Sequence, residues 1–565
     1  MQIPINERTN ISQVFAARVS DTPEAPAYRQ CENGEWVDYT WKDTNREVTR
    51  WQQAMKKEGL HAGDRVAVCM SNCFEWVLFD QAAIGLGLIT VPLYFGDRPD
   101  NMAWCMSDAG VKLLVLESDD IWPQLKGKVE TLERVVTLAP LHQDDEKLTS
   151  LDDWLPDAAG ELAQLDVNGK ELATIVYTSG TTGRPKGVML SHYNILSNVD
   201  AGLRIISISA SDRFISFLPL SHMFERTVGY YIGVTGGAQT VYARGITELG
   251  EDLQQQSPTV MVCVPRIFER INTKMQAGLP PNSLKRTLFE KATDIGWKRF
   301  KGTASLMDHL LWPILKALVA KKIHARLGGR IRLIVVGAAA LAPELSKIFV
   351  GLGLPIIQGY GLTETSPIAC ANRLDDNDPA SVGKPLPEVE IELSGKGEVL
   401  IRGPLVMMGY WNNETATQAV IDSDGWFHSG DIGEFRDGRL YITGRAKEII
   451  VMSNGEKLPP GDVEQAIMMD TAFEQLMIIG EGRAKLGMLA VSDIENEKEL
   501  CDRANAKLKD FPGWVRIHYL KRMSEPWSVE NGFMTPTLKL KRASIEKHWA
   551  KEIEEIFAGP DLSKT

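Results

Sequence analysis

The sequence has few cysteines and no pattern that would pair them. Its 565 residues contain 7 Cys, an odd number, and no Cys-x-x-Cys pair occurs. These absences argue against a disulfide-stapled secreted scaffold and against a cysteine zinc site. The first residues, Met1 to Arg8, also lack the apolar core of a secretory signal. We therefore expect a protein of a reducing compartment, with a cytoplasmic location.

A long hydrophobic run is also missing. The longest apolar stretch, residues 82–96, includes three Gly and one Pro. A helix that crosses a bilayer needs about 20 predominantly apolar residues. The stretch is therefore predicted to form a strand, a turn and a second strand inside a protein core.

Positive charge is in deficit over the whole chain. There are 62 Lys and Arg against 74 Asp and Glu, a net charge of −12, which argues against a nucleic-acid partner. Residues 285–332 are the exception, with twelve basic and three acidic side chains. Within them, Leu311 to Leu318 has apolar residues at helical spacing and predicts an amphipathic helix despite Pro313. Such a basic segment can lie on an anionic membrane surface. The alternative is a solvated helix hairpin that packs on the main domain.

The remaining composition is that of a globular protein, with 44 % apolar and 24 % charged residues. Helix-like segments alternate with short β-rich runs, which is typical of α/β domains with mostly parallel sheets. Beyond about residue 380, short β runs separated by Gly, Asp and Asn indicate a smaller β-rich subdomain. The predicted helices are 45–57, 73–86 and 460–469, and the predicted strands are 65–69, 88–92, 112–116, 214–218, 259–264, 332–336, 389–393, 398–402, 439–443 and 449–452.

One loop has the composition of a phosphate cradle. Residues 178–187, Thr-Ser-Gly-Thr-Thr-Gly-Arg-Pro-Lys-Gly, follow a β-rich run. Gly permits turns that point successive backbone N–H groups inward, while the hydroxyls and Lys186 add donors and a mobile charge. The loop is not a Walker loop, because Pro185 stands where that loop has Gly. A polar surface loop is the alternative that composition alone leaves open.

The full string from Tyr177 to Val188 resembles the signature loop of the adenylate-forming enzymes. These include acyl-CoA synthetases, firefly-type luciferases and the adenylation domains of peptide synthetases, and further motifs of the family recur in order along nearly the whole chain. The resemblance implies a large α/β domain, residues 1–446, with two α/β subdomains and a β-rich subdomain. A small mobile α+β domain, residues 447–565, would follow. ATP, Mg²⁺ and coenzyme A are the implied cofactors and co-substrates.

The resemblance also implies where the nucleotide binds. Residues 358–365, Gln-Gly-Tyr-Gly-Leu-Thr-Glu-Thr, are similar to a second family signature, in which Tyr360 lies near adenine, Thr363 touches the α-phosphate and Glu364 helps to hold Mg²⁺. Residues 426–431 resemble the ribose motif, and residues 337–341 resemble an adenine-side turn that is usually richer in Gly. The implied binding residues are Thr178, Ser179, Gly180, Thr181, Thr182, Gly183, Ala338, Gln358, Gly359, Tyr360, Gly361, Asp431, Arg445, Lys447 and Gly455, with Glu364 and Thr178 as implied metal ligands.

Two further motifs supply implied catalytic residues. His222, within residues 218–226, matches a histidine that the family places near the carboxylate; a purely structural histidine is the alternative. Residues 531–542 resemble the segment with the family's catalytic lysine, which Lys539 matches best and Lys541 matches as the alternative. A cation there can offset charge that develops between carboxylate and α-phosphate. The implied catalytic set is Lys539, Glu364, Thr363, His222 and Lys186.

Three segments resemble the long-chain fatty acyl-CoA synthetases in particular, namely residues 535–542, residues 265–269 and the basic insertion from Arg270 to Arg330. Such enzymes convert a fatty acid and ATP to acyl-AMP and pass the acyl group to the thiol of coenzyme A. The resemblance implies that the small domain rotates between the two half-reactions, with Lys447 at the hinge and Gly455 on the segment that lines the pantetheine tunnel.

Two other interpretations stay open at the level of sequence. One is a ligase that hands the acyl group to a carrier protein, and the other is a membrane-associated fatty-acid binding or transport protein with vestigial ATP chemistry. The implied partners are small molecules, and residues 285–332 add an expected peripheral contact with the inner face of a membrane. The sequence carries no signal for an oligomeric state.

Overall fold

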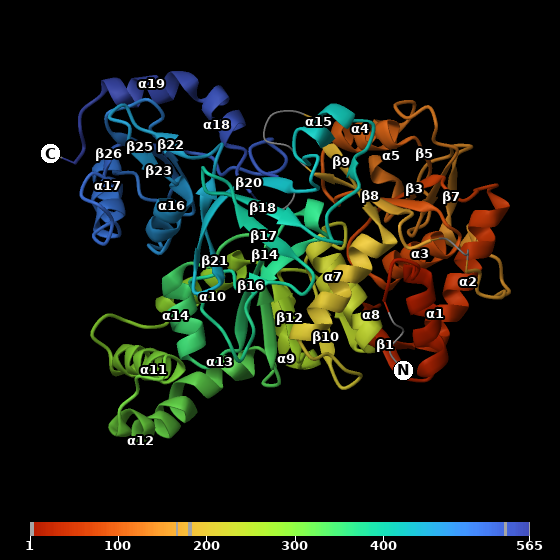
Figure 1. The fold of residues 1–565 in the computed structure, drawn as a ribbon, viewed down its shortest axis with the longest axis horizontal. Coiled ribbons are helices and arrows are strands. Elements are labelled where there is room, and N and C mark those ends of the chain that lie inside the picture. Colours follow the sequence, from red (N-terminus) through yellow and green to blue (C-terminus); the bar gives the residue numbers. More distant parts are fainter. Residues whose placement is uncertain (1–4, 165–167, 179–183, 536–538, 564–565) are drawn as a thin grey trace.

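Two large sheets, a smaller sheet and a separate C-terminal body make up the chain (Figure 1). The computed structural model describes residues 5–164, 168–178, 184–535 and 539–563. Of the implied binding residues, Ser179, Gly180, Thr181, Thr182 and Gly183 lie outside these ranges. Among the described residues, no helix combines the length and the apolar character needed to cross a membrane.

The first large sheet has the strand order β19-β9-β8-β4-β3-β5-β6-β7. Strands β3 to β8 pair in parallel, and β9 and β19 are antiparallel additions at one edge. Parallel strands are covered on both faces, so their sequences are continuous apolar runs. The strands are β3 (Arg65–Cys69), β4 (Ile89–Pro92), β5 (Val111–Leu116), β6 (Arg134–Thr137), β7 (Leu148–Ser150), β8 (Leu172–Thr178), β9 (Lys186–Ser191) and β19 (Gly409–Tyr410).

The second large sheet has the order β16-β15-β14-β13-β12-β10-β11-β1-β2. Its central strands are parallel, and antiparallel strands close both edges. The strands are β1 (Pro26–Glu32), β2 (Glu35–Thr40), β10 (Arg213–Ser216), β11 (Gln239–Tyr242), β12 (Val260–Cys263), β13 (Leu333–Val336), β14 (Ile356–Gly361), β15 (Ile368–Ala371) and β16 (Lys384–Pro385).

Helices cover these sheets and fill the space between them. Every residue of α3 (Phe74–Gly85) except Glu75 is buried, because this helix packs on β1 of one sheet and on β3 and β4 of the other. The other helices of this part are α1 (Ile11–Asp21), α2 (Trp41–Lys57), α4 (Pro99–Ala109), η1 (Asp119–Ile121), α5 (Trp122–Leu125), α6 (Leu151–Trp154), α7 (His192–Ile205), η2 (Glu225–Tyr231), α8 (Ile232–Gly236), α9 (Leu249–Gln256), α10 (Pro265–Ala277), α11 (Leu284–Phe300), α12 (Leu306–Leu315), η3 (Lys316–Ala320), α13 (Lys321–Arg326), α14 (Pro343–Gly351), η4 (Thr363–Thr365) and α15 (Glu414–Gln418).

An antiparallel sheet of four strands follows, in the order β17 (Glu390–Leu393), β18 (Glu398–Arg402), β20 (Phe427–Arg436) and β21 (Arg439–Arg445). The C-terminal body then has a small hairpin and a three-stranded sheet. Alternate residues of that sheet enter two separate apolar clusters, so helices cover both of its faces. Its elements are β22 (Ile450–Val451), β23 (Lys457–Leu458), α16 (Pro460–Met468), β24 (Gln475–Ile479), β25 (Leu486–Val491), α17 (Glu497–Ala506), β26 (Ile517–Met523), α18 (Arg542–His548) and α19 (Ala550–Ala558).

The predicted elements are confirmed with small shifts at their ends, except over residues 82–96. There the prediction of two strands is wrong: the segment contains the end of α3, a turn and the single strand β4. A helix that is buried all round has no polar face, so its sequence lacks the amphipathic pattern that distinguishes a helix from buried strands.

Candidate active site at the junction of the two domains

The carboxylate of Asp431 is held from two directions. Asp431 lies on β20 and is 4 % exposed. Its Oδ1 lies 2.9 Å from Nε of Arg445, and its Oδ2 accepts a hydrogen bond of 2.7 Å from the hydroxyl of Tyr360. Asp431 and Arg445 face each other across the β20–β21 pair, so the sheet register fixes their approach. Burial raises the pKa of the Asp431 carboxyl, and the guanidinium of Arg445 opposes that shift.

Glu364 is linked through Tyr410 to Lys186, the first residue of the strand that follows the phosphate loop. It lies on η4, and its Oε1 accepts a hydrogen bond of 2.9 Å from the hydroxyl of Tyr410 on β19. The ammonium of Lys186 lies 4.9 Å from the centre of the Tyr410 ring, a cation–π distance. Thr178, at the end of β8, is the register partner of Lys186. A carboxylate and a hydroxyl beside phosphate oxygens are the hard oxygen donors that Mg²⁺ prefers, so this donor set fits that ion.

Backbone shape at the β13 and β14 ends depends on small residues. Ala338 has a φ of +66°, in the left-handed region that a residue with a Cβ enters at a cost. At Gly361 a Cβ would lie 1.7 Å from the carbonyl oxygen of Pro367, so only Gly fits. Both hydrogen-bonding atoms of the Gln358 amide are used within the protein, since Oε1 accepts from the backbone N of Leu341 and Nε2 donates to the backbone. Gln358 therefore supports the turn that contains Ala338.

His222 and Lys539 approach the same place from different domains. Nδ1 of His222 accepts a hydrogen bond of 3.2 Å from the backbone N–H of Phe224. Burial and the Lys539 ammonium lower the pKa of His222 to about 4, so the ring is neutral at pH 7 and carries its proton on Nε2. Lys539 as a residue is exposed, yet the protein atoms around its ammonium lower its pKa. Arg445 adds to that shift, and Asp431 opposes it.

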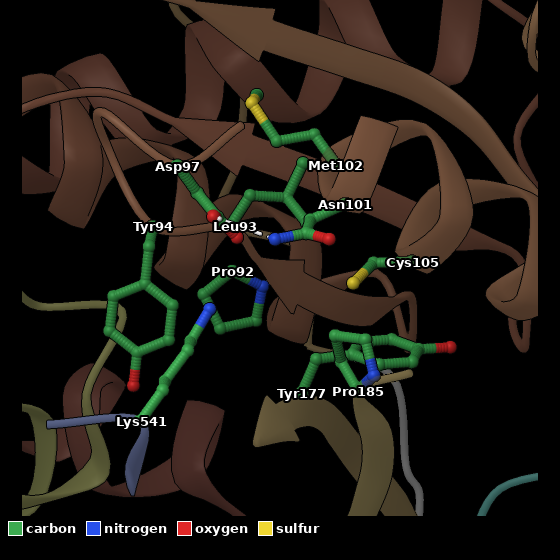
Figure 2. A pocket seen from close by; sticks show the side chains of 10 residues that line it. All are labelled: Pro92, Leu93, Tyr94, Asp97, Asn101, Met102, Cys105, Tyr177, Pro185 and Lys541. Atoms are coloured by element: carbon green, nitrogen blue, oxygen red, sulfur yellow. Dashed lines mark hydrogen bonds between the residues drawn. The ribbon is translucent and has the colours of Figure 1, made fainter. Parts of the chain in front are cut away.

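Lys541, the other candidate for the catalytic lysine, lines a pocket beside β4. Its side chain lines this pocket with Tyr94 and Asp97 from the β4–α4 connection and with Pro185 beside the phosphate loop (Figure 2). Figure 2 shows the Lys541 amine reaching toward Pro92. The structure thus separates the two lysines, with Lys539 near Asp431 and His222, and Lys541 on the side of β4.

Lys447 and Gly455 lie at the start of the small domain. Lys447 is exposed in the turn after β21, where the backbone N of Ala446 donates to the carbonyl oxygen of Gly430 at 2.9 Å. Gly455 lies in the turn between β22 and β23 with a φ of +85°, and a Cβ there would meet no atom within 4 Å. Lys447 therefore lies in the chain just after the Asp431–Arg445 ion pair, and Gly455 lies on an open hairpin turn.

Sequence reasoning missed a buried polar layer behind His222. Arg226 pairs with Asp80, and both side chains are fully buried. Nη1 of Arg226 also donates to Thr174 at 2.9 Å, and the hydroxyl of Tyr231 donates to Asp80 at 2.7 Å. The two charged partners are 146 residues apart in sequence, so only the presence of Arg226 inside the motif 218–226 could have drawn attention to it. Tyr410, which contacts both Glu364 and Lys186, was missed as well, because an isolated aromatic residue gives no signal.

Comparisons with known proteins agree with this geometry. Residues 15–411 match the AMP-binding enzyme family, and residues 447–561 match the AMP-binding enzyme C-terminal domain. The Long-chain-fatty-acid--CoA ligase FadD15 of Mycobacterium bovis is 30 % identical, over 98 % of this chain and 98 % of its own. The Long-chain-fatty-acid--[acyl-carrier-protein] ligase AEE15, chloroplastic, of Arabidopsis thaliana is 26 % identical, over 92 % of this chain and 82 % of its own.

Among solved structures, the anthranilate CoA ligase AuaEII in complex with anthranoyl-AMP has the same fold. Its TM-score is 0.77 at 19 % identity, over 97 % of this chain and 99 % of that one. The large domain and the small domain thus both have counterparts in that structure. Since the first family match spans more than half of the sequence and a relative is 30 % identical along its full length, the chain belongs to the AMP-binding enzyme family.

Proposed function

We propose that this protein is a long-chain fatty acid–CoA ligase that forms acyl-AMP from a fatty acid and ATP and then transfers the acyl group to coenzyme A. The observation that carries the proposal is the cluster of Asp431, Glu364, His222 and Lys539, to which both domains contribute. Full-length similarity to FadD15, whose name gives this activity, supports the choice of acid and acceptor.

In this proposal, ATP binds across the C-terminal ends of β8 and β14, with its ribose at Asp431 on β20. Asp431 accepts hydrogen bonds from the ribose hydroxyls, and Arg445 holds the Asp431 carboxylate in place. Tyr360 lies against the adenine, between Gly359 and Gly361 on β14 and next to the turn that contains Ala338. The phosphates lie on the loop 178–187, with Thr363 at the α-phosphate. When bound by Glu364 and Thr178, Mg²⁺ would offset phosphate charge.

The first half-reaction needs positioning and electrostatics rather than a covalent enzyme intermediate. A carboxylate oxygen of the fatty acid attacks the α-phosphorus, the new O–P bond forms, and the bond to pyrophosphate breaks. Lys539 stabilises the negative charge that accumulates around the α-phosphorus. Neutral His222 offers Nε2–H to a carboxylate oxygen of the acid, and Lys186 binds the outer phosphates.

In the second half-reaction, the thiol of coenzyme A loses its proton to solvent, its sulfur forms a bond to the carbonyl carbon of acyl-AMP, and the C–O bond to AMP breaks. We place the domain boundary between residues 446 and 447, with Lys447 as the hinge. Rotation there would remove Lys539 from the site and bring the Gly455 turn toward it, to line the path of the pantetheine arm.

A ligase that uses a carrier protein is the second candidate, because AEE15 is named for that acceptor and aligns over most of its length. We also propose a cytoplasmic location, with residues 285–332 in peripheral contact with the inner face of a membrane.

Isotope exchange between pyrophosphate and ATP, driven by a panel of fatty acids, tests the proposed function. We expect exchange with long-chain acids in the absence of coenzyme A, and thioester only when coenzyme A is added. Exchange with thioester formed only on an acyl carrier protein would establish the second candidate. Fatty-acid binding without any exchange would overturn both and favour a binding or transport protein.

A further inference from the structure

Half of the large apolar side chains that the described residues expose come from one short region. Of fourteen such residues, seven lie between Leu284 and Leu318. Leu306 is 85 % exposed and Leu310 is 71 % exposed. Scattered single apolar residues are normal on a protein surface, but a concentration of this kind marks an interaction site.

The exposed residues share one side of a continuous helical segment. Leu306, Leu310, Ile314 and Leu318 are four residues apart along α12 and η3, so they follow one another on the same face. The opposite face already has a partner, since Leu315 is buried in an apolar cluster with residues of α11. α12 packs on α11, and α11 packs on α14. Figure 1 shows α12 at the lower edge of the molecule, beyond α11.

The charges of this segment have one sign. No Asp or Glu occurs between Asp308 and Glu344. Within that interval Lys316, Lys321 and Lys322 are exposed, and in the described part of the chain none of them forms an ion pair. On α11, by contrast, basic side chains pair within the helix, as Lys298 does with Asp294 at 2.8 Å. The cations that follow α12 are thus available to an external anion.

We propose that α12 lies flat on an anionic lipid surface, with Leu306, Leu310 and Ile314 among the acyl chains and Lys316, Lys321 and Lys322 at the headgroups. An amphipathic helix with basic residues beside its apolar face binds in this way. A second copy of the chain fits less well, because pairing two such faces brings like charges together. The purpose of docking rests on the proposed function: a long-chain acid is dissolved in the bilayer, so docking brings the enzyme to its substrate.

Sedimentation with phosphatidylglycerol vesicles, without ATP or fatty acid, tests the docking. We expect binding that weakens with added salt and that is much weaker on phosphatidylcholine vesicles. Leu310→Glu with Ile314→Glu should lower the partition coefficient at least tenfold. Lys321→Gln and Lys322→Gln should each lower it about fivefold on anionic vesicles. Leu374→Glu, at an exposed leucine elsewhere, is the matched control and should bind as the unmodified protein does.

Equal vesicle binding by the Leu310→Glu, Ile314→Glu variant and the control would overturn the proposal. So would a dimer, seen by sedimentation velocity, that this variant abolishes in a protein with no affinity for vesicles. Thermal unfolding midpoints check that the exposed substitutions leave the fold intact. Pyrophosphate exchange with a short soluble acid is measured on the same samples, so loss of the proposed function and loss of docking are told apart.

Discussion

Replacing Glu225 by Gln should remove a loss of stability that the native chain undergoes as the pH rises from about 4.5 to about 8. Glu225 begins η2 and is 1 % exposed. Its Oε1 accepts a hydrogen bond of 2.6 Å from the hydroxyl of Ser216, and its Oε2 has no hydrogen-bond partner among the described residues. Burial raises the pKa of this carboxyl from 4.5 to about 8.

The sign and the size of the effect follow from proton linkage. Between the two pKa values the folded chain keeps the Glu225 proton and the unfolded chain loses it, so the free energy of unfolding falls as pH rises. The contribution is fully present below pH 4.5 and is lost by about pH 8. At about 1.4 kcal/mol per unit, the total is about 5 kcal/mol. Gln has the shape of the protonated acid and does not titrate, so the free energy of unfolding of the variant lacks this decrease with pH.

Urea unfolding of both proteins across this pH range measures the effect. The difference in free energy of unfolding between Glu225→Gln and the unmodified chain should grow in favour of the variant as pH rises. Tyr242 and Cys263, which interact electrostatically with this carboxyl, have pKa values raised by burial and stay neutral throughout. Glu35→Gln, at an exposed glutamate, is the control. Parallel curves for all three proteins would refute the assignment of Glu225 as a buried neutral acid.

Three further predictions concern the site and its support. Lys539→Ala should lower the rate of acyl-AMP formation by roughly a hundredfold or more yet still convert supplied acyl-AMP to thioester, whereas Lys541→Ala should keep both rates within a few fold. Single-turnover assays measure the two half-reactions separately, and an equal loss in both would contradict the role of Lys539. Lys447→Pro should slow thioester formation more than adenylation, and unchanged overall turnover would remove the hinge assignment. Asp80→Asn leaves the buried Arg226 guanidinium without its charge partner and should lower the free energy of unfolding, measured in urea, by about 3–5 kcal/mol. A change below about 1 kcal/mol would show that the pair is not a stabilising contact.

Much of the fold could be predicted from the sequence because the local signals agree with the tertiary structure. The run at residues 65–69 forms β3 with the predicted bounds, since a parallel strand covered on both faces is apolar throughout. The helix that ends before residue 86 shows the limit of this approach. Residues 82–85 fall both in the predicted helix 73–86 and in the two predicted strands of 82–96, because burial on almost all sides removes the periodicity that tells a helix from a strand.

At the candidate site, the motifs supplied the residues but not their partners. The sequence could not separate Lys539 from Lys541, because they are two positions apart and only the folded loop decides which side each one faces. Contacts between distant segments, such as Tyr410 with Glu364, have no local signal at all. Residues 179–183 lie outside the described residues, so their part in binding phosphate stays a prediction.

The ion pair between Asp431 and Arg445 has a consequence for the order of events in the cycle. Arg445 is the last residue of β21, and Lys447 follows two positions later. In the proposed cycle, a rotation about Lys447 would therefore start just past this ion-paired pair of strands, and the ribose of the ligand would stay with the large domain. Glu364 and His222 would also stay with the large domain, and only Lys539 of the proposed cluster would leave. The acyl-AMP would remain bound while Lys539 leaves and the Gly455 turn approaches. This hydrolysable anhydride would therefore not dissociate between the two half-reactions.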